Sequence, residues 1–369
     1  MAISSVLGSS ALLPAGLGFR NKIINGDMTV NQRGYTSASP VSVSTGSQVY
    51  YSTDRWYGSG ETSQGVYSLG QSTTVPSSET FINSLVATCT TADASLATTD
   101  DYEFGQAIEG FNASSLGYGT SAAKQSVLSF WVRSSLIGTY CVALRNSASN
   151  RSYIAEYTIN VADTWEKKTI YIIGDTTGTW LKNTSTGINI TWALAAGSTY
   201  QTAAGSWTAG NYLCSSNQVN WMSSSTSRTF YITGVQLEQN SQPTPFEQRP
   251  YGVELALCQR YYWRTQAGRN NSSTGIIDAY VGVAADQNTW VRYAVPYPVP
   301  MRTQPTFGSG GSFTNLLAGG GYGASSVGAY ITSELSGSVY LYSAGISLGG
   351  SGSMRLNNTS TFMDFSAEL

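Results

Sequence analysis

The feature that most constrains this chain is a two-residue alternation of apolar and polar side chains, repeated in short runs. One run, SVLSFWVRSS over 126–135, places three apolar side chains on one face and Trp131 and Arg133 on the other. The same period recurs over 138–146, 152–161, 164–173 and 228–238. This pattern predicts β-strands with one buried face. Turn segments rich in Gly, Ser and Asn separate the runs, so we expect an all-β chain with a jelly-roll β-sandwich.

The composition supports a folded chain and excludes several kinds of site. Charged residues make up only 11% of the chain and aromatic residues 12%, the reverse of the balance in disordered chains. The formal net charge is −2, so we expect no nucleic-acid partner, because such partners need a basic surface. The chain has no histidine, which excludes Ser-His-Asp and Cys-His catalysis and zinc sites with imidazole ligands.

The four cysteines, Cys89, Cys141, Cys214 and Cys258, are widely spaced and include no Cys-x-x-Cys pair. Free cysteine is among the residue types most often buried, so we expect isolated, buried thiols. One disulfide bond between two of them is the alternative that the sequence leaves open.

Residues 1–20 are predicted to form an N-terminal docking arm. The segment has no positively charged start, and Gly8 and Pro14 interrupt its apolar residues, so it does not fit a signal peptide. No stretch of the chain approaches the length of about 18 apolar residues that a membrane helix needs, so we expect no membrane insertion. Two interpretations stay open. The segment is either a frayed tail or an arm in which Leu12 and Leu13 pack on a partner or a second copy.

A proline-rich break near residues 243–250 marks the predicted domain boundary. We expect the jelly-roll domain over 21–248 and a second, smaller β-domain over 264–369. The linker, 249–263, contains apolar residues at four-residue spacing, which predicts a short helix. Such a helix is unstable alone, so its apolar face needs cover from the sandwich, the second domain or a neighbouring subunit. The residues to which we assign this assembly role are Leu255, Leu257, Tyr261 and Tyr262.

Four segments resemble, in their order, a family of bacteriophage virion proteins called tail fibre or appendage proteins, including those of cyanobacterial phages. They are FRNKIINGDMTVNQRG (19–34), YSTDRWYG (51–58), ITGVQLEQNSQPTPFEQRPYGVELALCQRYYWR (232–264) and PVPMRTQPT (298–306). The resemblance extends over nearly the full length. Residues 20–248 also resemble the carbohydrate-binding jelly rolls of secreted hydrolases, through the NGD opening and the LSFWVR and TWEKKTIYI strands.

The resemblance implies a structural component of the virion, on the surface of the phage particle, without enzymatic activity. By analogy with such appendages, we expect a homotrimer in contact with other virion proteins. The leading role is a tail fibre or adhesin that contacts host-surface polysaccharide. The first alternative is a capsid decoration or head-fibre protein. The weaker alternative is a polysaccharide-degrading tailspike.

Aromatic rings suit the apolar face of a sugar, so the candidates for stacking are Trp56, Tyr57, Trp131 and Tyr153, although most strand tryptophans lie in a core. Because Trp131 alternates with core positions, we expect Trp131 and Arg133 to face outward on a concave surface, with Glu156 on a nearby strand. Loops on a rigid scaffold often bind ligands, so Tyr322 in the Gly-rich segment 308–326 is a further carbohydrate-binding candidate.

The acidic residues are interpreted as structural. The densest group, Asp100, Asp101 and Glu103, is predicted to be an exposed turn rather than the paired carboxylates of a glycoside hydrolase. Arg249 is expected to pair with Glu247 or Glu254 in a structural corner.

No cofactor is predicted. The resemblance to carbohydrate-binding jelly rolls leaves a structural calcium ion as an alternative, with Asp27 and Glu238 as its side-chain ligands. Calcium takes about six to eight oxygen ligands, and only these two side chains are available from the sequence.

Overall fold

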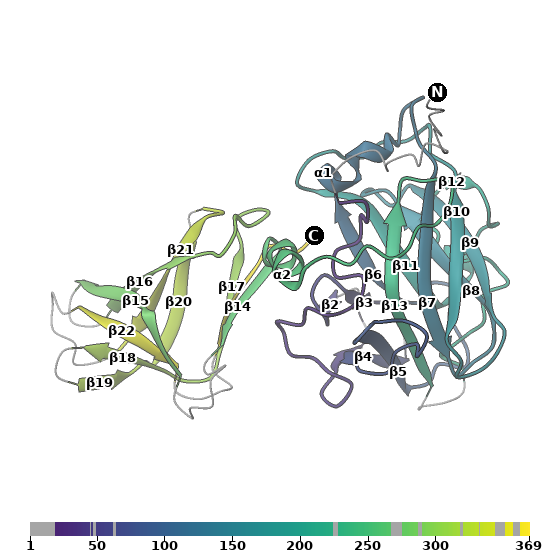
Figure 1. The fold of residues 1–369 in the computed structure, drawn as a ribbon. Coiled ribbons are helices and arrows are strands. Elements are labelled where there is room, and N and C mark those ends of the chain that lie inside the picture. Colours follow the sequence, from purple (N-terminus) through teal and green to yellow (C-terminus); the bar gives the residue numbers. More distant parts are fainter. Residues whose placement is uncertain are drawn as a thin grey trace, which may run out of the picture.

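The computed structural model describes residues 19–44, 46, 49–61, 64–223, 228–266, 275–286, 290–317, 320–331, 333–343, 351–356 and 362–369. Figure 1 shows two β-structures of unequal size, with helix α2 (Tyr251–Gln259) and the C-terminus between them. Nearly all regular elements of the described residues are strands, which confirms the predicted all-β class. Leu12 and Leu13, predicted to take part in assembly, lie outside the described residues.

The larger unit consists of a six-stranded and a seven-stranded sheet, and each strand pairs antiparallel with its neighbours. The six-stranded sheet has the spatial order β1 (Val41–Val43), β4 (Val66–Ser72), β5 (Ser84–Thr91), β13 (Thr229–Glu238), β7 (Ser126–Ser134), β10 (Glu166–Ile172). The seven-stranded sheet has the order β12 (Trp207–Ala209), β9 (Arg151–Ile159), β8 (Gly138–Arg145), β11 (Thr186–Ala196), β6 (Asp101–Glu109), β3 (Tyr57–Ser59), β2 (Tyr50–Tyr51). The chain passes repeatedly from one sheet to the other, as expected for a jelly-roll sandwich.

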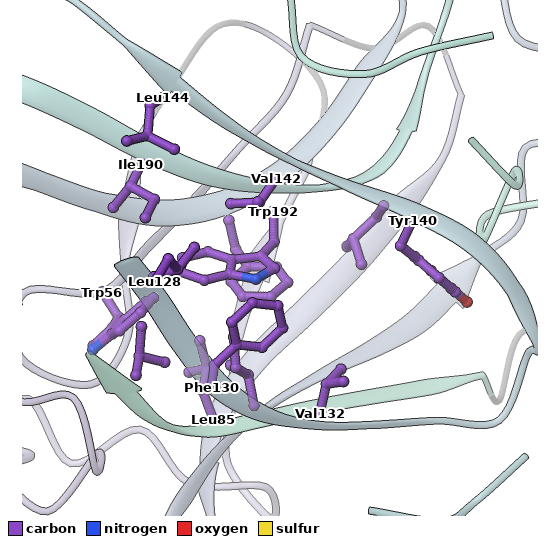
Figure 2. Close-up of a cluster of buried hydrophobic side chains, with 14 of the residues drawn as sticks. Trp56, Leu85, Leu128, Phe130, Val132, Tyr140, Val142, Leu144, Ile190 and Trp192 are labelled. Carbon is purple, nitrogen blue, oxygen red and sulfur yellow. The ribbon is translucent and has the colours of Figure 1, made fainter. Parts of the chain in front are cut away.

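Side chains from both sheets fill the space between them, as Figure 2 shows. Trp192 of β11 lies at the centre of this core. Its ring stacks on that of Phe104 with centroids 5.9 Å apart, and it meets the ring of Phe130 edge-on at 5.5 Å. Offset-stacked and edge-on arrangements are the favoured geometries of aromatic pairs, so these contacts add directional preference to the burial of apolar area.

A second apolar cluster covers part of the outer face of the seven-stranded sheet. It contains Cys141 and Ile154 from the sheet, with Leu213 and Cys214 from the segment that crosses it. All four cysteines of the chain are free and buried, which confirms the prediction of isolated thiols.

The helices of the sandwich are single turns. They are α1 (Gly110–Ala113), η1 (Ser114–Leu116) and η2 (Ser198–Tyr200). None of the helices in the described residues combines the length and the apolar character that a bilayer crossing requires.

The smaller unit also consists of two antiparallel sheets. The three-stranded sheet has the order β14 (Tyr262–Gln266), β23 (Phe362–Ser366), β17 (Thr306–Gly310). The other sheet has the order β19 (Gly320–Gly323), β18 (Phe313–Leu317), β22 (Ser351–Leu356), β15 (Gly275–Asp286), β16 (Trp290–Pro296), β21 (Ser336–Tyr342), β20 (Ser326–Ile331). The core of this smaller unit includes Val291 and Leu341 from the larger of its two sheets and Phe365 from the three-stranded sheet. Since β14 begins at Tyr262, the predicted linker 249–263 contains α2 and the first two residues of this unit.

Helix α2 begins directly after Pro250, which lacks the N–H that a helix interior needs. Tyr261 and Tyr262, just beyond its end, are 0% and 3% exposed inside this single chain. Tyr261 donates a 2.6 Å hydrogen bond to Glu109 of the sandwich. This corrects the expectation that both tyrosines serve assembly, because the two units of the same chain already cover them. Leu255 and Leu257 are half-buried, and their assembly role stays a prediction.

The last three residues join the two units. The N–H of Ala367 donates to the carbonyl of Tyr261 at 2.7 Å, and the hydroxyl of Tyr51 donates to the carbonyl of Leu369 at 2.8 Å. The Glu368 carboxylate forms ion pairs with Arg55 and Arg33 of the sandwich, the second at 3.2 Å. A network of buried charges and main-chain bonds therefore fixes the smaller unit to the larger one.

Candidate functional site

The outer face of the six-stranded sheet carries aromatic and basic side chains. Along β7, Leu128, Phe130 and Val132 belong to the core between the sheets. Since side chains of a strand alternate between its two faces, Trp131 and Arg133 point outward. Both are half-buried. The outward orientation predicted for these two residues is confirmed.

Strand pairing places partners on both sides of Trp131. Lys167 of β10 lies opposite Trp131 on one side, and Thr233 of β13 on the other. Arg133 lies opposite Tyr231 in the next row. Directly opposed side chains in antiparallel strands have Cβ atoms about 4.5–5.5 Å apart, so they are contact neighbours. We call these positions, together with Trp165, the Trp131 surface: Trp131, Arg133, Trp165, Lys167 and Tyr231.

The second row of this surface is a packed group of three side chains. The ring of Trp165, directly before β10, meets that of Tyr231 edge-on with centroids 6.1 Å apart. The guanidinium carbon of Arg133 lies 5.0 Å from the Tyr231 ring centroid, within range of a cation–π interaction. Asp163 holds the same guanidinium in place through an ion pair of 3.1 Å and a main-chain hydrogen bond of 2.8 Å. The orientation of Arg133 is therefore fixed before any ligand arrives.

Lys167 differs from the other cations of this region. It is exposed, and no ion pair or hydrogen bond engages its ammonium group within the described residues. Its neighbour Lys168 pairs with Glu166 at 2.6 Å. Burial works to raise the pKa of Glu166, but hydrogen bonds from Lys168, Val161 and Asn160 outweigh it and hold the pKa at about 2. The charge of Lys168 is thus compensated, and that of Lys167 is available to a ligand.

The Trp131 surface has the chemistry to bind a molecule with both an apolar face and polar substituents. The indole ring of Trp131 offers an apolar platform, and no other ring of the described residues stacks on it. Lys167 and Arg133 provide N–H donors beside it. Because the positions belong to hydrogen-bonded strands, the platform is rigid.

Three other aromatic candidates lie in the interior. Trp56, Tyr57 and Tyr153 are 0%, 7% and 6% exposed. Trp56 donates a 2.9 Å hydrogen bond to the carbonyl of Asn25 and belongs to the sandwich core. None of the three presents a free face to solvent. This agrees with the alternative interpretation of the sequence, in which strand aromatic residues belong to a core.

Glu156 lies on the opposite side of the sandwich from Trp131 and Arg133, so the prediction that they share one face is wrong. Glu156 belongs to β9 of the seven-stranded sheet, where it is exposed and accepts a 3.0 Å hydrogen bond from Asn217. The sequence shows that Glu156 points outward, but the chain changes sheets between β7 and β9, and alternation does not reveal such a change.

Tyr322 lies in β19, opposite Asn315 of β18. The Gly-rich segment 308–326 was predicted to be a loop. Its described residues instead contain the end of β17 and the strands β18 and β19, because neighbouring strands satisfy the backbone groups of this segment.

The acidic group Asp100, Asp101 and Glu103 is buried, with exposed fractions of 3%, 8% and 6%, so the predicted exposed turn is wrong. Arg145 donates to both carboxylate oxygens of Glu103 at 2.9 Å. Burial, together with the charge of Glu103, raises the pKa of Asp101 to about 7. The group occupies the start of β6, where a cationic partner and main-chain donors replace water.

The proposed calcium ligand Glu238 already has protein partners. Its carboxylate accepts hydrogen bonds from Thr244 at 2.8 and 2.9 Å and forms an ion pair with Arg20 at 3.4 Å. Asp27 accepts a weak 3.4 Å hydrogen bond from Thr29. Within the described ranges, no group of three or more Cys, Asp or Glu side chains is placed to hold a metal ion.

The corner predicted around Arg249 is confirmed. Arg249 pairs with Glu247 at 3.0 Å and with Glu254 at 3.2 Å. These contacts tie the segment after the proline break to the first residues of the sandwich, since Glu247 also accepts from the N–H groups of Arg20 and Asn21.

Sequence reasoning missed Trp165, Lys167 and Tyr231 as parts of the site. Each occupies a polar-face position in an alternating run, so the orientation of each was readable. What the sequence did not show was the lateral order β13-β7-β10, which brings three separate segments together.

No protein-family model and no curated protein sequence matches this chain. Among solved structures, the enzymatically active domain of tailspike protein 4 of bacteriophage CBA120 is similar at 12% identity and a TM-score of 0.31, covering 60% of this chain and 21% of that one. A family 61 carbohydrate-binding module in complex with β-1,4-galactotriose is similar at 13% identity and a TM-score of 0.30, covering 60% and 100%. The CBM22-1 xylan-binding domain of Paenibacillus barcinonensis Xyn10C has 7% identity and a TM-score of 0.28, covering 54% and 99%. Similarities this low assign no function, and the chain spans only about a fifth of the tailspike structure.

Proposed function

We propose that this chain is a structural protein of a bacteriophage virion without enzymatic activity, a tail fibre or adhesin whose Trp131 surface binds a glycan of the host surface. The observation that carries the glycan part is the position of Trp131, an indole ring on an outer sheet face with Lys167 and Arg133 beside it. Sugars combine an apolar C–H face with hydroxyl groups at the rim. An aromatic platform with flanking N–H donors complements both.

The sheet gives this surface a second property that favours binding. Trp131 is near the middle of β7, which is paired with β10 on one side and β13 on the other. Arg133 is held by Asp163. Groups that are already ordered lose little conformational entropy when a ligand binds, which matters for weakly binding sugars.

We propose the absence of enzymatic activity because the carboxyl groups of the densest acidic cluster are buried. Glycoside hydrolysis needs two carboxyl groups about 5–9.5 Å apart that can reach substrate. Asp101 and Glu103 are buried, and Glu103 is bound to Arg145. A carboxylate engaged in this way is poorly placed to give or take a proton from a bound sugar.

The virion part of the proposal is supported by the order of the four sequence segments that resemble tail fibre proteins. The assembly that we propose is a homotrimer in contact with other virion proteins. Since Tyr261 and Tyr262 are covered within one chain, the contacts between copies would use other surfaces, including the half-buried Leu255 and Leu257 and the arm with Leu12 and Leu13.

Glycan binding is tested with the full-length protein on arrays of bacterial surface polysaccharides. Trp131→Ala and Tyr231→Ala should each weaken binding about tenfold or more, which corresponds to about 1.4 kcal/mol. Phe111→Ala is the matched control, because Phe111 is an aromatic residue, 56% exposed, on α1 rather than on the Trp131 surface. Binding that survives both substitutions would remove the Trp131 surface from the function.

The location is tested by immunogold labelling of intact phage particles with antibodies against the full-length protein. Labelling of the tail supports the fibre or adhesin role. Labelling of the head would replace it with the capsid-decoration alternative. A second readout is adsorption, since purified protein that occupies host glycans should reduce phage attachment.

A further inference from the structure

We propose that the Trp131 surface selects glycans in which the sugar residue stacked on Trp131 carries an anionic ring substituent such as the carboxylate of a uronic acid. This inference rests on the proposed glycan-binding function and adds the chemical class of the ligand. It is carried by the pairing of Lys167 directly opposite Trp131.

The first step is the charge balance of the surface. Two cations, Arg133 and Lys167, project from it, and one carboxylate, Asp163, lies beside them. The charges of Glu166 and Lys168 cancel each other in an ion pair, and both side chains lie on the other face of β10. The local charge is therefore positive, although the whole chain has a formal net charge of −2.

The second step is the difference between the two cations. Arg133 is committed, because Asp163 binds it through both its side chain and its main-chain carbonyl, and the Tyr231 ring faces it. Lys167 is exposed and has no such partner in the described part of the chain. An unpaired cation on a flexible stem can reorient toward a ligand at little cost in lost interactions.

The pairing of β7 with β10 also places the side chains of Trp131 and Lys167 close together. Opposed residues on neighbouring antiparallel strands have Cβ atoms about 4.5–5.5 Å apart. A sugar stacked on the indole of Trp131 therefore has its ring substituents within reach of the Lys167 ammonium group. A hydroxyl group there gains an ordinary hydrogen bond, whereas a carboxylate gains a charge-assisted one, which is roughly twice as strong. The surface thus discriminates by charge at one rim of the platform.

The experiment measures binding of the full-length protein to polygalacturonate, alginate and hyaluronate, each beside its carboxyl-reduced, neutral counterpart. Neutral dextran, xylan and galactan complete the set. We expect at least one acidic polymer to bind about five- to tenfold more tightly than its reduced form. Added salt should weaken this preference progressively, because the Debye length that limits exposed charge pairs falls from about 10 Å at 0.1 M to about 3 Å at 1 M.

Variants locate the source of the preference. Lys167→Gln should abolish the acidic preference, and Lys167→Arg should retain it. Lys168→Gln is the matched control, because Lys168 is the next residue of β10 and is already paired with Glu166. Circular dichroism confirms that each variant is folded.

The outcomes separate this inference from the proposed function. Equal binding of acidic and reduced polymers, or a preference that persists in Lys167→Gln, overturns the inference while glycan binding stands. An absence of binding to every polymer in the set, with wild-type protein at high concentration, counts against both.

Discussion

The buried guanidinium of Arg55 forms an ion pair with the carboxylate of Glu368, which lies 313 positions further along the chain. Arg55 is 1% exposed and also donates to the carbonyl of Ala107 in β6. Glu368 lies two positions after the end of β23 in the smaller unit. A single charge pair thus connects the sandwich to the end of the chain, and it does so away from solvent.

Replacement of Glu368 by Gln should destabilise the protein by about 3–5 kcal/mol, because it leaves the buried charge of Arg55 without its partner. The measurement is urea unfolding of the full-length protein. Glu334→Gln, an exposed carboxylate in the same unit, is the control and should change the unfolding free energy by less than about 0.5 kcal/mol. A Glu368→Gln protein as stable as wild type would show that the junction does not depend on this pair.

The buried carboxyl group of Asp101 should make stability depend on pH. Its pKa is raised from 3.8 to about 7 in the folded protein. The folded state therefore holds this proton more tightly than the unfolded state does. The resulting stabilisation is complete below pH 4 and is lost as the pH rises to about 7, a change on the order of 2–4 kcal/mol.

Asp101→Asn keeps an acceptor for the N–H of Glu61 and removes the titration. We expect this variant to flatten the pH dependence between 4 and 7 and to be more stable than wild type at pH 8. Glu79→Gln, at an exposed position, serves as the comparison. Unfolding curves of Asp101→Asn that run parallel to wild type across this range would contradict the assignment.

Gly105 of β6 should not tolerate a side chain. A Cβ atom there would lie 2.1 Å from the carbonyl oxygen of Ile190 and 2.8 Å from the Thr191 side chain, so the backbone of β11 would have to move. Gly105→Ala should cost about 1–3 kcal/mol or more. Thermal unfolding measures the effect.

Gly252 of α2 provides the matched comparison for Gly105. A Cβ atom there meets nothing within 4 Å, and alanine favours a helix over glycine by up to about 1 kcal/mol. Gly252→Ala should therefore be neutral or stabilising. If both substitutions had the same effect, the close approach of β6 and β11 would be wrong.

The four thiols should be unreactive in the folded protein. Each cysteine is 0% exposed, and burial raises the pKa of all four thiol groups, so the reactive thiolate is scarce and inaccessible. Titration with a disulfide reagent should label none of them within minutes under native conditions. In denaturant, the same reagent should label four equivalents. Rapid labelling of any thiol without denaturant would contradict the packing described for it.

The local pattern of the chain predicted much of this architecture. The runs at 126–135 and 164–173 became β7 and β10, and Trp131 and Arg133 face outward as their alternation requires. Pro243 to Pro250 separate the two β-units, and α2 begins directly after them. The corner at Arg249 followed from charges close in sequence.

Other features depended on contacts that are distant in sequence. Asp101 has a charged neighbour, but its burial arises from segments that cross the start of β6. Trp131 belongs to β7 and Glu156 to β9, and these two strands lie in different sheets. The cover of Tyr261 and Tyr262 comes in part from Glu109 and from residues after β23.

By itself, the sequence determined the strands of its alternating runs, such as β7 and β10, and which side of each of these strands is apolar, because period-two alternation is a local property of the backbone. Only the tertiary structure decided which strands are neighbours, and so which polar-face residues meet. Strand pairing is made by main-chain hydrogen bonds that are the same for every residue type, so the lateral order that joins Lys167, Trp131 and Tyr231 is set by packing of the whole sandwich.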